Sequence, residues 1–122
     1  MPLLYEDLTG QILKACFDVI NELGAGFLES VYHNALLITL RQIGLKAEPQ
    51  VSTQVMFRGL VVGQFIADIL VEDKVLVELK AVKTLLPEHQ AQVINYLKAT
   101  GIQVGLLVNF GNQKLEYRRL HM

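Results

Sequence analysis

Three charged residues lie inside two apolar stretches near the middle of the chain. Asp68 falls in "GQFIADILV", and Glu78 and Lys80 fall in "KVLVELKAV". Burying a charged group in such surroundings is costly unless a partner satisfies it. The polar turn 72–74 between the stretches predicts a hairpin in which residue 68 lies directly opposite residue 78. The two carboxylates would then share one face of a sheet with Lys80, with the Cβ atoms of the acids roughly 5 Å apart.

Two carboxylates that face each other in an apolar setting repel, and one lysine cannot neutralise both. A divalent cation between them would turn this repulsion into a binding site. Hard cations such as Mg²⁺ take carboxylate oxygens and keep waters that a substrate phosphate can replace. Lys80 would place a fixed positive charge near a phosphate oxygen or an attacking water. We therefore expect a metal site at Asp68 and Glu78; the alternative is a buried ion pair between Lys80 and one of the acids.

The elements that must position these residues follow from hydrophobic periodicity and from turn residues. Helices are expected at 8–24 and 29–44, each ending at a glycine. A third helix is expected at 86–101, with Pro87 in its first turn and Gly101 at its end. Strands are expected at 51–57, 60–71, 74–82, 103–110 and 114–120, with Arg58 and Gly59 forming a hairpin turn. This order predicts an α/β protein with a mixed central sheet flanked by helices, in which helix 86–101 is the crossover between parallel strands.

The same patterns predict which side chains face the core. On helix 8–24 these are Ile12, Cys16, Val19, Ile20 and Leu23. On helix 29–44 they are Val31, Ala35, Ile38 and Gln42. On the central hairpin, the face opposite the acids is expected to hold Ala67, Ile69, Val71, Val75, Val77 and Leu79.

Length and composition limit the class of protein. With 122 residues, 52% of them hydrophobic, the chain is expected to form a single domain over 1–122. The formal net charge of −1 is low for a nucleic-acid binder, and one cysteine permits neither an internal disulfide nor a zinc cluster. The acidic N-terminal stretch is unlike a secretory signal, and no apolar run reaches the roughly 20 residues that span a bilayer. We expect a cytoplasmic protein without membrane contact that forms a homo-oligomer, such as a dimer.

The residues and their order resemble a known family. Asp68, followed on the next strand by Glu78-Leu79-Lys80, is similar to the bipartite acidic motif of the PD-(D/E)XK nuclease superfamily. The helix from Pro87 carries Gln92 and Tyr96, which resemble the Q-x-x-x-Y motif of RecB-type members. Upstream, the stretch 26–32 reads G-x-x-E-x-x-Y, which names a small bacterial group of the same superfamily. The resemblance implies the restriction-endonuclease-like core, with its αβββαβ order.

The resemblance also implies roles for individual residues. Asp68, Glu78 and the backbone carbonyl of Leu79 would hold Mg²⁺ or Mn²⁺, and Lys80 would orient or activate the nucleophile. Glu29 is a candidate third acidic ligand, although a carboxylate in the first turn of a helix is also favoured by the helix dipole. Gln92 is expected to position Lys80 or a substrate phosphate. Tyr96, four residues further along the helix, either supports Gln92 or is a core aromatic.

The activity implied is metal-dependent hydrolysis of phosphodiester bonds in nucleic acid, either DNA or RNA. Phosphate contacts normally come from Lys and Arg. Few such residues are present here, and the candidates are Lys80, Lys83, Lys98, Arg58, Arg118 and Arg119. Two other classes of function remain open. The chain could be a nuclease-fold module that binds nucleic acid without cutting it, or a subunit whose function is a protein contact.

Overall fold

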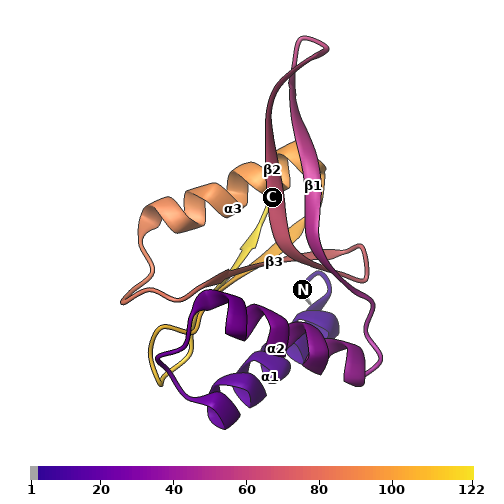
Figure 1. Ribbon diagram of the computed structural model, residues 1–122. Coiled ribbons are helices and arrows are strands. Elements are labelled where there is room, and N and C mark those ends of the chain that lie inside the picture. Colours follow the sequence, from indigo (N-terminus) through magenta and orange to yellow (C-terminus); the bar gives the residue numbers. More distant parts are fainter. Residues whose placement is uncertain (1–2) are drawn as a thin grey trace.

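A computed structural model describes residues 3–122 of the chain. Helices α1 and α2 come first, followed by three strands, helix α3 and two more strands (Figure 1). The bounds are α1 Glu6–Leu23, α2 Glu29–Gln42, β1 Ala47–Phe57, β2 Leu60–Val71, β3 Val75–Lys80, α3 Pro87–Thr100, β4 Val104–Asn109 and β5 Glu116–His121. The expected elements are therefore all present, with ends that differ by a few residues.

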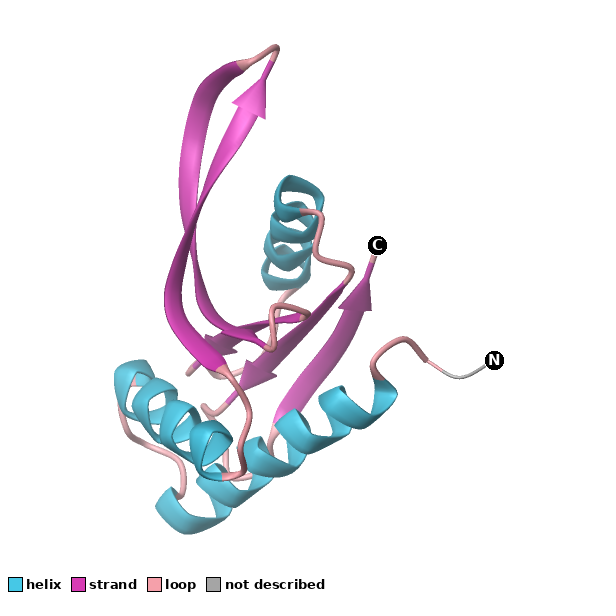
Figure 2. Cartoon of the chain, turned by 90° about the vertical axis from the view of Figure 1, so that its right-hand side faces the viewer, coloured by secondary structure: helices cyan, strands magenta, loops and turns pink. Residues whose placement is uncertain are grey.

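The strands form one five-stranded sheet in the order β1-β2-β3-β4-β5. Strands β3 and β4 are parallel, and every other neighbouring pair is antiparallel. Helix α3 connects the parallel pair, as a crossover must. Figures 1 and 2 show α1 and α2 on one face of the sheet and α3 on the other. The mixed α/β fold predicted from the sequence is confirmed.

The two faces of the sheet bury separate hydrophobic clusters. The larger cluster lies under α1 and α2 and includes Ile12, Tyr32, Ile69, Leu79 and Phe110. The smaller cluster lies under α3 and includes Leu76, Val93, Leu97 and Leu107. Strand β4 is buried along its whole length, as its continuous apolar sequence predicts. Cys16 belongs to the core as expected, and burial raises the pKa of its thiol to about 12.

The register of the central hairpin agrees with the sequence prediction. Ile69 pairs with Val77 and Val71 pairs with Val75, which is the alignment that sets residue 68 against residue 78. Glu72 and Asp73 adopt φ values of 54° and 56° in the turn between them. The other predicted turn is also present, since Arg58 and Gly59 have φ values of 51° and 80°. Positive φ at both central residues is typical of a type I′ hairpin.

Three predictions about buried faces were wrong. Helix α2 buries Tyr32, Leu36 and Leu40. In the predicted row Ala35 packs against the core, whereas Ile38 is 57% exposed. The bulky ring of Tyr32 stacks on Phe110, with ring centroids 5.1 Å apart, and this contact turns the helix by about one residue relative to the expected row. Leu23 is also exposed, at the last position of α1.

Ala67 packs with the α3 cluster instead of with Ile69 and Val71. The paired register of β2 with β3 begins only at Ile69, so strict alternation of faces does not extend through Asp68. On the other side of β2, Gln50 of β1 has a φ of 54°, which interrupts the regular strand next to Asp68. β2 therefore bends where the acidic residue lies.

Among the helices of residues 3–122, none combines the length and the apolar character needed to cross a bilayer.

Candidate metal centre

The two acidic residues lie where β2 parts from β3. The regular backbone pairing of the two strands ends at Ile69 and Val77. Beyond that pair, hydrogen bonds from the Asp68 and Glu78 side chains link the strands instead. The backbone N–H of Asp68 donates to Oε1 of Glu78 at 3.2 Å, and the backbone N–H of Leu79 donates to Oδ2 of Asp68 at 2.8 Å. Each carboxylate thus reaches the opposite strand, and the pair is brought together as the sequence predicts.

Glu78 is the unusual member of the pair because it is only 5% exposed. Burial in the first place, and the negative charge of Asp68 in the second, raise the pKa of Glu78 to about 8. The backbone hydrogen bond from Asp68 and the charge of Lys80 act in the opposite direction without cancelling the shift. Without a cation, these surroundings favour the protonated form of the Glu78 carboxyl.

Lys80 connects the acids to α3. Its Nζ donates to Oε1 of Gln92 at 3.5 Å, and Nε2 of Gln92 donates to the hydroxyl of Tyr96 at 2.7 Å. Tyr96 is fixed from the other side by Phe65 of β2, with the rings stacked and their centroids 3.8 Å apart. Burial and the charge of Glu78 raise the pKa of Tyr96, so its hydroxyl stays protonated near the acids. The expected contact between Gln92 and Lys80 is present.

Helix α2 supplies a second group of residues beside Asp68. A cavity of about 410 Å³ is lined by Glu29, Ser30, His33, Asn34, Leu37, Pro49, Gln50, Asp68 and Leu79. Partial burial raises the pKa of Glu29, and the charge of Asp68 adds to this shift, while Lys80 and His33 oppose it. Glu29 is thus close enough to share an electrostatic environment with the proposed ligands, from the first turn of α2.

His33 is a site residue that the sequence interpretation missed. Its Nε2 lies 2.9 Å from the backbone carbonyl oxygen of Asp68. A carbonyl can only accept, so Nε2 carries the proton and donates it. The available signal was the spacing, because residues 29 and 33 are one helical turn apart and share a face.

Tyr32 has a structural role. It is fully buried, its hydroxyl donates to the carbonyl of Gly24 at 2.6 Å, and it accepts the N–H of Phe27 at 3.1 Å. These bonds hold the loop that begins α2 and so place Glu29. His89 lies away from the acids, where its Nδ1 accepts the N–H of Leu86 at the start of α3.

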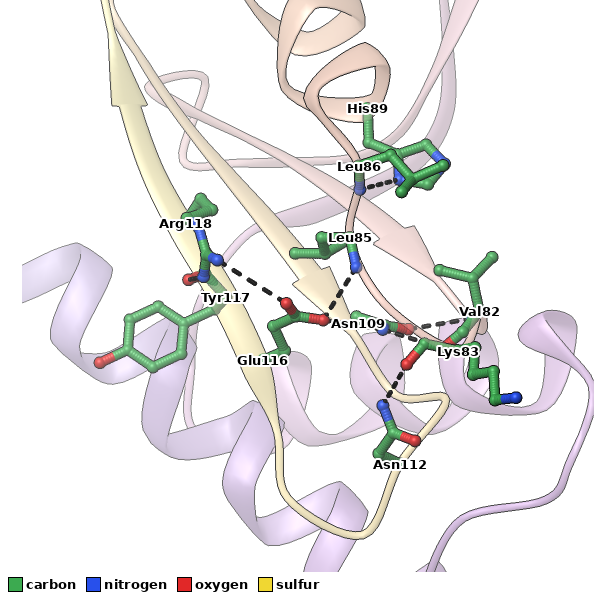
Figure 3. A network of polar contacts seen from close by, with 10 residues as sticks. All are labelled: Val82, Lys83, Leu85, Leu86, His89, Asn109, Asn112, Glu116, Tyr117 and Arg118. Carbon is green, nitrogen blue, oxygen red and sulfur yellow. Dashed lines mark hydrogen bonds and ion pairs between the residues drawn. The ribbon is translucent and has the colours of Figure 1, made fainter.

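The loop that follows Lys80 is held by a separate polar network (Figure 3). Asn109, which is fully buried, bonds both the N–H and the carbonyl of Val82, at 3.0 and 2.9 Å. Oε1 of Glu116 accepts from Leu85 N–H at 3.0 Å and from Asn109 Nδ2 at 3.2 Å. A Cβ at Gly111 would collide with the Val82 backbone, so only glycine permits this approach. The network fixes the end of β3 that carries Lys80.

The donor set fits a hard divalent cation in kind. Carboxylate oxygens from Asp68 and Glu78, with the Leu79 carbonyl between them in sequence, are the oxygen ligands that Mg²⁺ and Mn²⁺ prefer. No cluster of three or more His, Cys, Asp or Glu side chains in metal-binding arrangement occurs within residues 3–122. The side chains therefore offer two ligands, and Glu29 lies outside that immediate pair.

Comparison with known protein families shows to which family this chain belongs. A family model described as the PD-(D/E)XK nuclease superfamily matches residues 6–120. The chain belongs to the PD-(D/E)XK nuclease superfamily. Nucleases of this superfamily generally use divalent metal ions. Asp68, Glu78 and Lys80, which resemble the superfamily's acidic motif in sequence, lie close together in the structure.

A solved structure supports the fold of this PD-(D/E)XK protein. The chain described as "Crystal structure of SSO0001" superposes with a TM-score of 0.62 and 22% sequence identity. The match covers 96% of the present chain and 59% of that chain, so the protein spans well under two thirds of the length of this neighbour. No curated protein shows significant similarity. The restriction-endonuclease-like fold is thus confirmed.

Proposed function

We propose that this PD-(D/E)XK protein is a divalent-cation-dependent nuclease that hydrolyses phosphodiester bonds in nucleic acid. The observation that carries the proposal is the buried Glu78 beside Asp68, with a pKa raised to about 8. A protein gains nothing in stability from placing a second carboxylate there. The arrangement becomes favourable when a cation binds.

In this proposal Asp68, Glu78 and the Leu79 carbonyl would hold Mg²⁺ or Mn²⁺, and Glu29 on α2 is the candidate further acidic ligand. When bound, the cation supplies Lewis-acid activation of water and stabilises negative charge on the phosphoryl group. Glu78 must release its proton to solvent before it can bind the metal.

The remaining residues position groups around the phosphate. Lys80 is placed to orient the nucleophile or to hold a phosphate oxygen, and Gln92 limits where its ammonium can lie. Tyr96 in turn holds Gln92, and its stacking on Phe65 makes that contact rigid. Gly26, Glu29 and Tyr32 also lead us to place the chain in the G-x-x-E-x-x-Y group. A cytoplasmic location, a homo-oligomer and a single domain over 1–122 stay predictions.

The substrate is DNA or RNA. Candidate phosphate contacts are spread widely: Arg58 lies in the β1–β2 turn, Lys98 on α3, and Arg118 and Arg119 on β5 at the far edge of the sheet. Lys83, together with Lys114 and Arg118, lines a separate cavity of about 490 Å³ beside Glu116. This distribution favours a short contact near Lys80 over a long basic track.

The test uses single-stranded, duplex and branched DNA and RNA with Mn²⁺ or Mg²⁺, and with a chelator as control. Asp68→Asn and Glu78→Gln should each lower the cleavage rate by about 10³-fold or more, because the cation is lost. Lys80→Ala should lower it by roughly 10²-fold while metal binding persists. Glu22→Gln is the control, since it alters an exposed acid on α1 outside the proposed centre, and it should retain activity.

Cleavage that survives in the Asp68 and Glu78 variants would contradict the proposal. Binding of nucleic acid without cleavage on any substrate would favour the non-catalytic module. No binding of nucleic acid at all would favour a protein whose function is a protein contact. Metal binding is measured separately, as the rise in melting temperature on adding Mg²⁺ or Mn²⁺.

A further inference from the structure

The cavity of about 410 Å³ beside Asp68 lies between α2 and the strands β1, β2 and β3. Its volume is in the range of sites that bind small molecules, roughly 300–1,000 Å³. Asp68 is part of its lining, so a group that occupies it lies next to the proposed metal centre. A nucleic acid whose phosphate is held at that centre would place a neighbouring sugar and base here.

The charges of this cavity are wrong for a second phosphate. Glu29 and Asp68 both line it, and among residues 3–122 no Lys or Arg does so. Phosphate contacts normally come from Lys and Arg, as in the other cavity, where Lys83, Lys114 and Arg118 are present. The group that fits beside Glu29 is therefore uncharged.

The remaining side chains of the lining match a nucleobase. A base has flat apolar faces and an edge of hydrogen-bond donors and acceptors, and proteins bind it by stacking on apolar side chains and by bonding its edge. The apolar side chains available are Leu37, Pro49 and Leu79. The uncharged groups that can bond an edge include the hydroxyl of Ser30 and the amides of Asn34 and Gln50.

Gln50 is the residue of this cavity with an unusual backbone. In the β1–β2 register it lies opposite Asp68, between two regular pairs of the ladder. Its φ is 54°, which is uncommon for residues other than glycine, and such strain clusters at active sites and ligand-binding sites. Since glycine would adopt this φ without strain, the backbone alone does not account for a glutamine here.

We propose that this cavity binds the nucleobase next to the phosphate held at the metal centre, and that it prefers adenine. The inference rests on the proposed nuclease function, because it requires that phosphate to be held beside Asp68. An Asn or Gln amide can bond adenine at both N6 and N7, and a carboxylate such as that of Glu29 can accept from an exocyclic amino group. Uracil and thymine have no such amino group.

Asn34 is linked to the metal ligand through His33. Oδ1 of Asn34 lies 3.5 Å from Nδ1 of His33, whose Nε2 donates to the carbonyl of Asp68. With Gln50 opposite Asp68 on β1 and Asn34 on α2, the two amides approach the cavity from different elements. A base between them would be read from two sides.

Binding of mononucleotides tests the proposal without any cleavage. The 5′- and 3′-monophosphates of adenosine, cytidine, guanosine and uridine are titrated in the presence of Mg²⁺ and followed by NMR. Adenosine monophosphate should bind about tenfold more tightly than uridine monophosphate, because only adenine can bond an amide at two atoms. The side-chain amide signals of Asn34 and Gln50 should shift with adenosine monophosphate.

Variants of the two amides separate recognition from folding. Gln50→Gly and Asn34→Ala should each reduce the preference for adenine over uracil to about twofold or less. Gln50→Gly should leave the melting temperature unchanged or raise it, since glycine relieves the backbone strain. Gln50→Asn keeps an amide, tolerates the positive φ and should retain part of the preference. Gln42→Ala, an exposed amide at the end of α2, is the control and should keep all of it.

Equal affinity for the four nucleotides, or no binding of any of them, would overturn the proposal. An adenine preference that survives in both Gln50→Gly and Asn34→Ala would also overturn it. These outcomes are distinct from failure of the nuclease proposal. Cleavage without base preference would leave the nuclease and remove the base pocket, whereas adenine preference without cleavage would do the reverse.

Discussion

Two glutamates of the same sheet have opposite environments. Glu78 on β3 lies beside Asp68, and burial together with that negative charge raises its pKa. Glu116 on β5 lies beside Asn109, and the hydrogen bonds from Asn109 and from Leu85 lower its pKa. Both residues flank β4, one on each side, so their position in the sheet does not explain the difference.

The difference lies in the number of donors. One oxygen of Glu116 accepts two N–H groups, and Arg118 lies 3.7 Å from the other oxygen. Glu78 accepts one backbone N–H at 3.2 Å and has a carboxylate as its neighbour. A carboxylate surrounded by donors completes a structure, whereas a buried carboxylate beside another one is a candidate cation ligand. This contrast separates the structural network from the proposed metal centre.

The largest effect is expected from breaking the hydrogen-bond network that surrounds Glu116. Asn109→Ala removes four hydrogen bonds and leaves partly buried backbone groups of Val82 and Gly111 without this partner. The free energy of unfolding should fall by about 3 kcal/mol or more, measured by urea denaturation. The loss should be the same with and without Mg²⁺, because the network lies outside the proposed centre. A loss below about 1 kcal/mol would mean that water replaces the amide.

The next effect concerns the pH dependence of Glu78. Its pKa in the folded protein, about 8, lies above the usual 4.5, so the folded state holds a proton that the unfolded state has released. Without metal, the free energy of unfolding should therefore fall as pH rises from about 5 to about 8, by roughly 1–3 kcal/mol, and then level off.

Glu78→Gln cannot titrate and should abolish this decrease, leaving the metal-free protein as stable as the wild type or more stable at pH 9. Denaturation at a series of pH values measures both. The same decrease in the variant would assign it to another group.

A smaller effect is expected at His33. Removing its hydrogen bond to the Asp68 carbonyl should change the free energy of unfolding by about 1 kcal/mol or less, because the ring is partly exposed. The affinity for Mn²⁺, measured by calorimetry, should fall several-fold, since outer hydrogen bonds orient metal ligands. His33→Gln keeps a donor and should recover part of that affinity. Unchanged affinity in His33→Ala would show that Asp68 needs no such support.

The smallest effect is expected at Glu116. Its pKa is lowered, so its stabilising contribution is present above the usual 4.5 and is lost as pH falls through the lower folded value. Glu116→Gln should cost less than about 1 kcal/mol at pH 7, because the side chain is partly solvated. It should also remove part of the decrease in stability between pH 5 and pH 3. A change in Mg²⁺ binding would contradict the separation of the two glutamates.

The sequence predicted the parts of this contrast that depend on local pattern. The polar turn 72–74 between two apolar strands set the register of Asp68 and Glu78, because a one-residue slip would have reversed every side chain. Pro87 and Gly101 marked the ends of α3, and the spacing of Gln92 and Tyr96 on that helix gave their contact. The PD-(D/E)XK relationship and the fold followed from these elements.

Features that depend on distant contacts could not be predicted in this way. The bond from His33 to Asp68 joins residues 35 positions apart, and the Asn109 network joins residues 27 positions apart. The prediction of the buried face of α2 was wrong because the Tyr32 ring stacks on Phe110, which lies near the other end of the chain. The predicted face of Ala67 was wrong because β2 bends at Asp68, and no local sequence pattern indicated this bend.

The short distance along the chain between the two acids has a consequence for folding kinetics. Asp68 and Glu78 are ten residues apart in a hairpin, whereas β3 and β4 pair only after the whole α3 crossover has formed. A hairpin closes in roughly 1–10 μs, and contacts distant in sequence form more slowly. We therefore expect the two acids to lie close together already in the transition state. A divalent cation should then increase the refolding rate, and not only slow unfolding, in stopped-flow experiments with and without Mg²⁺.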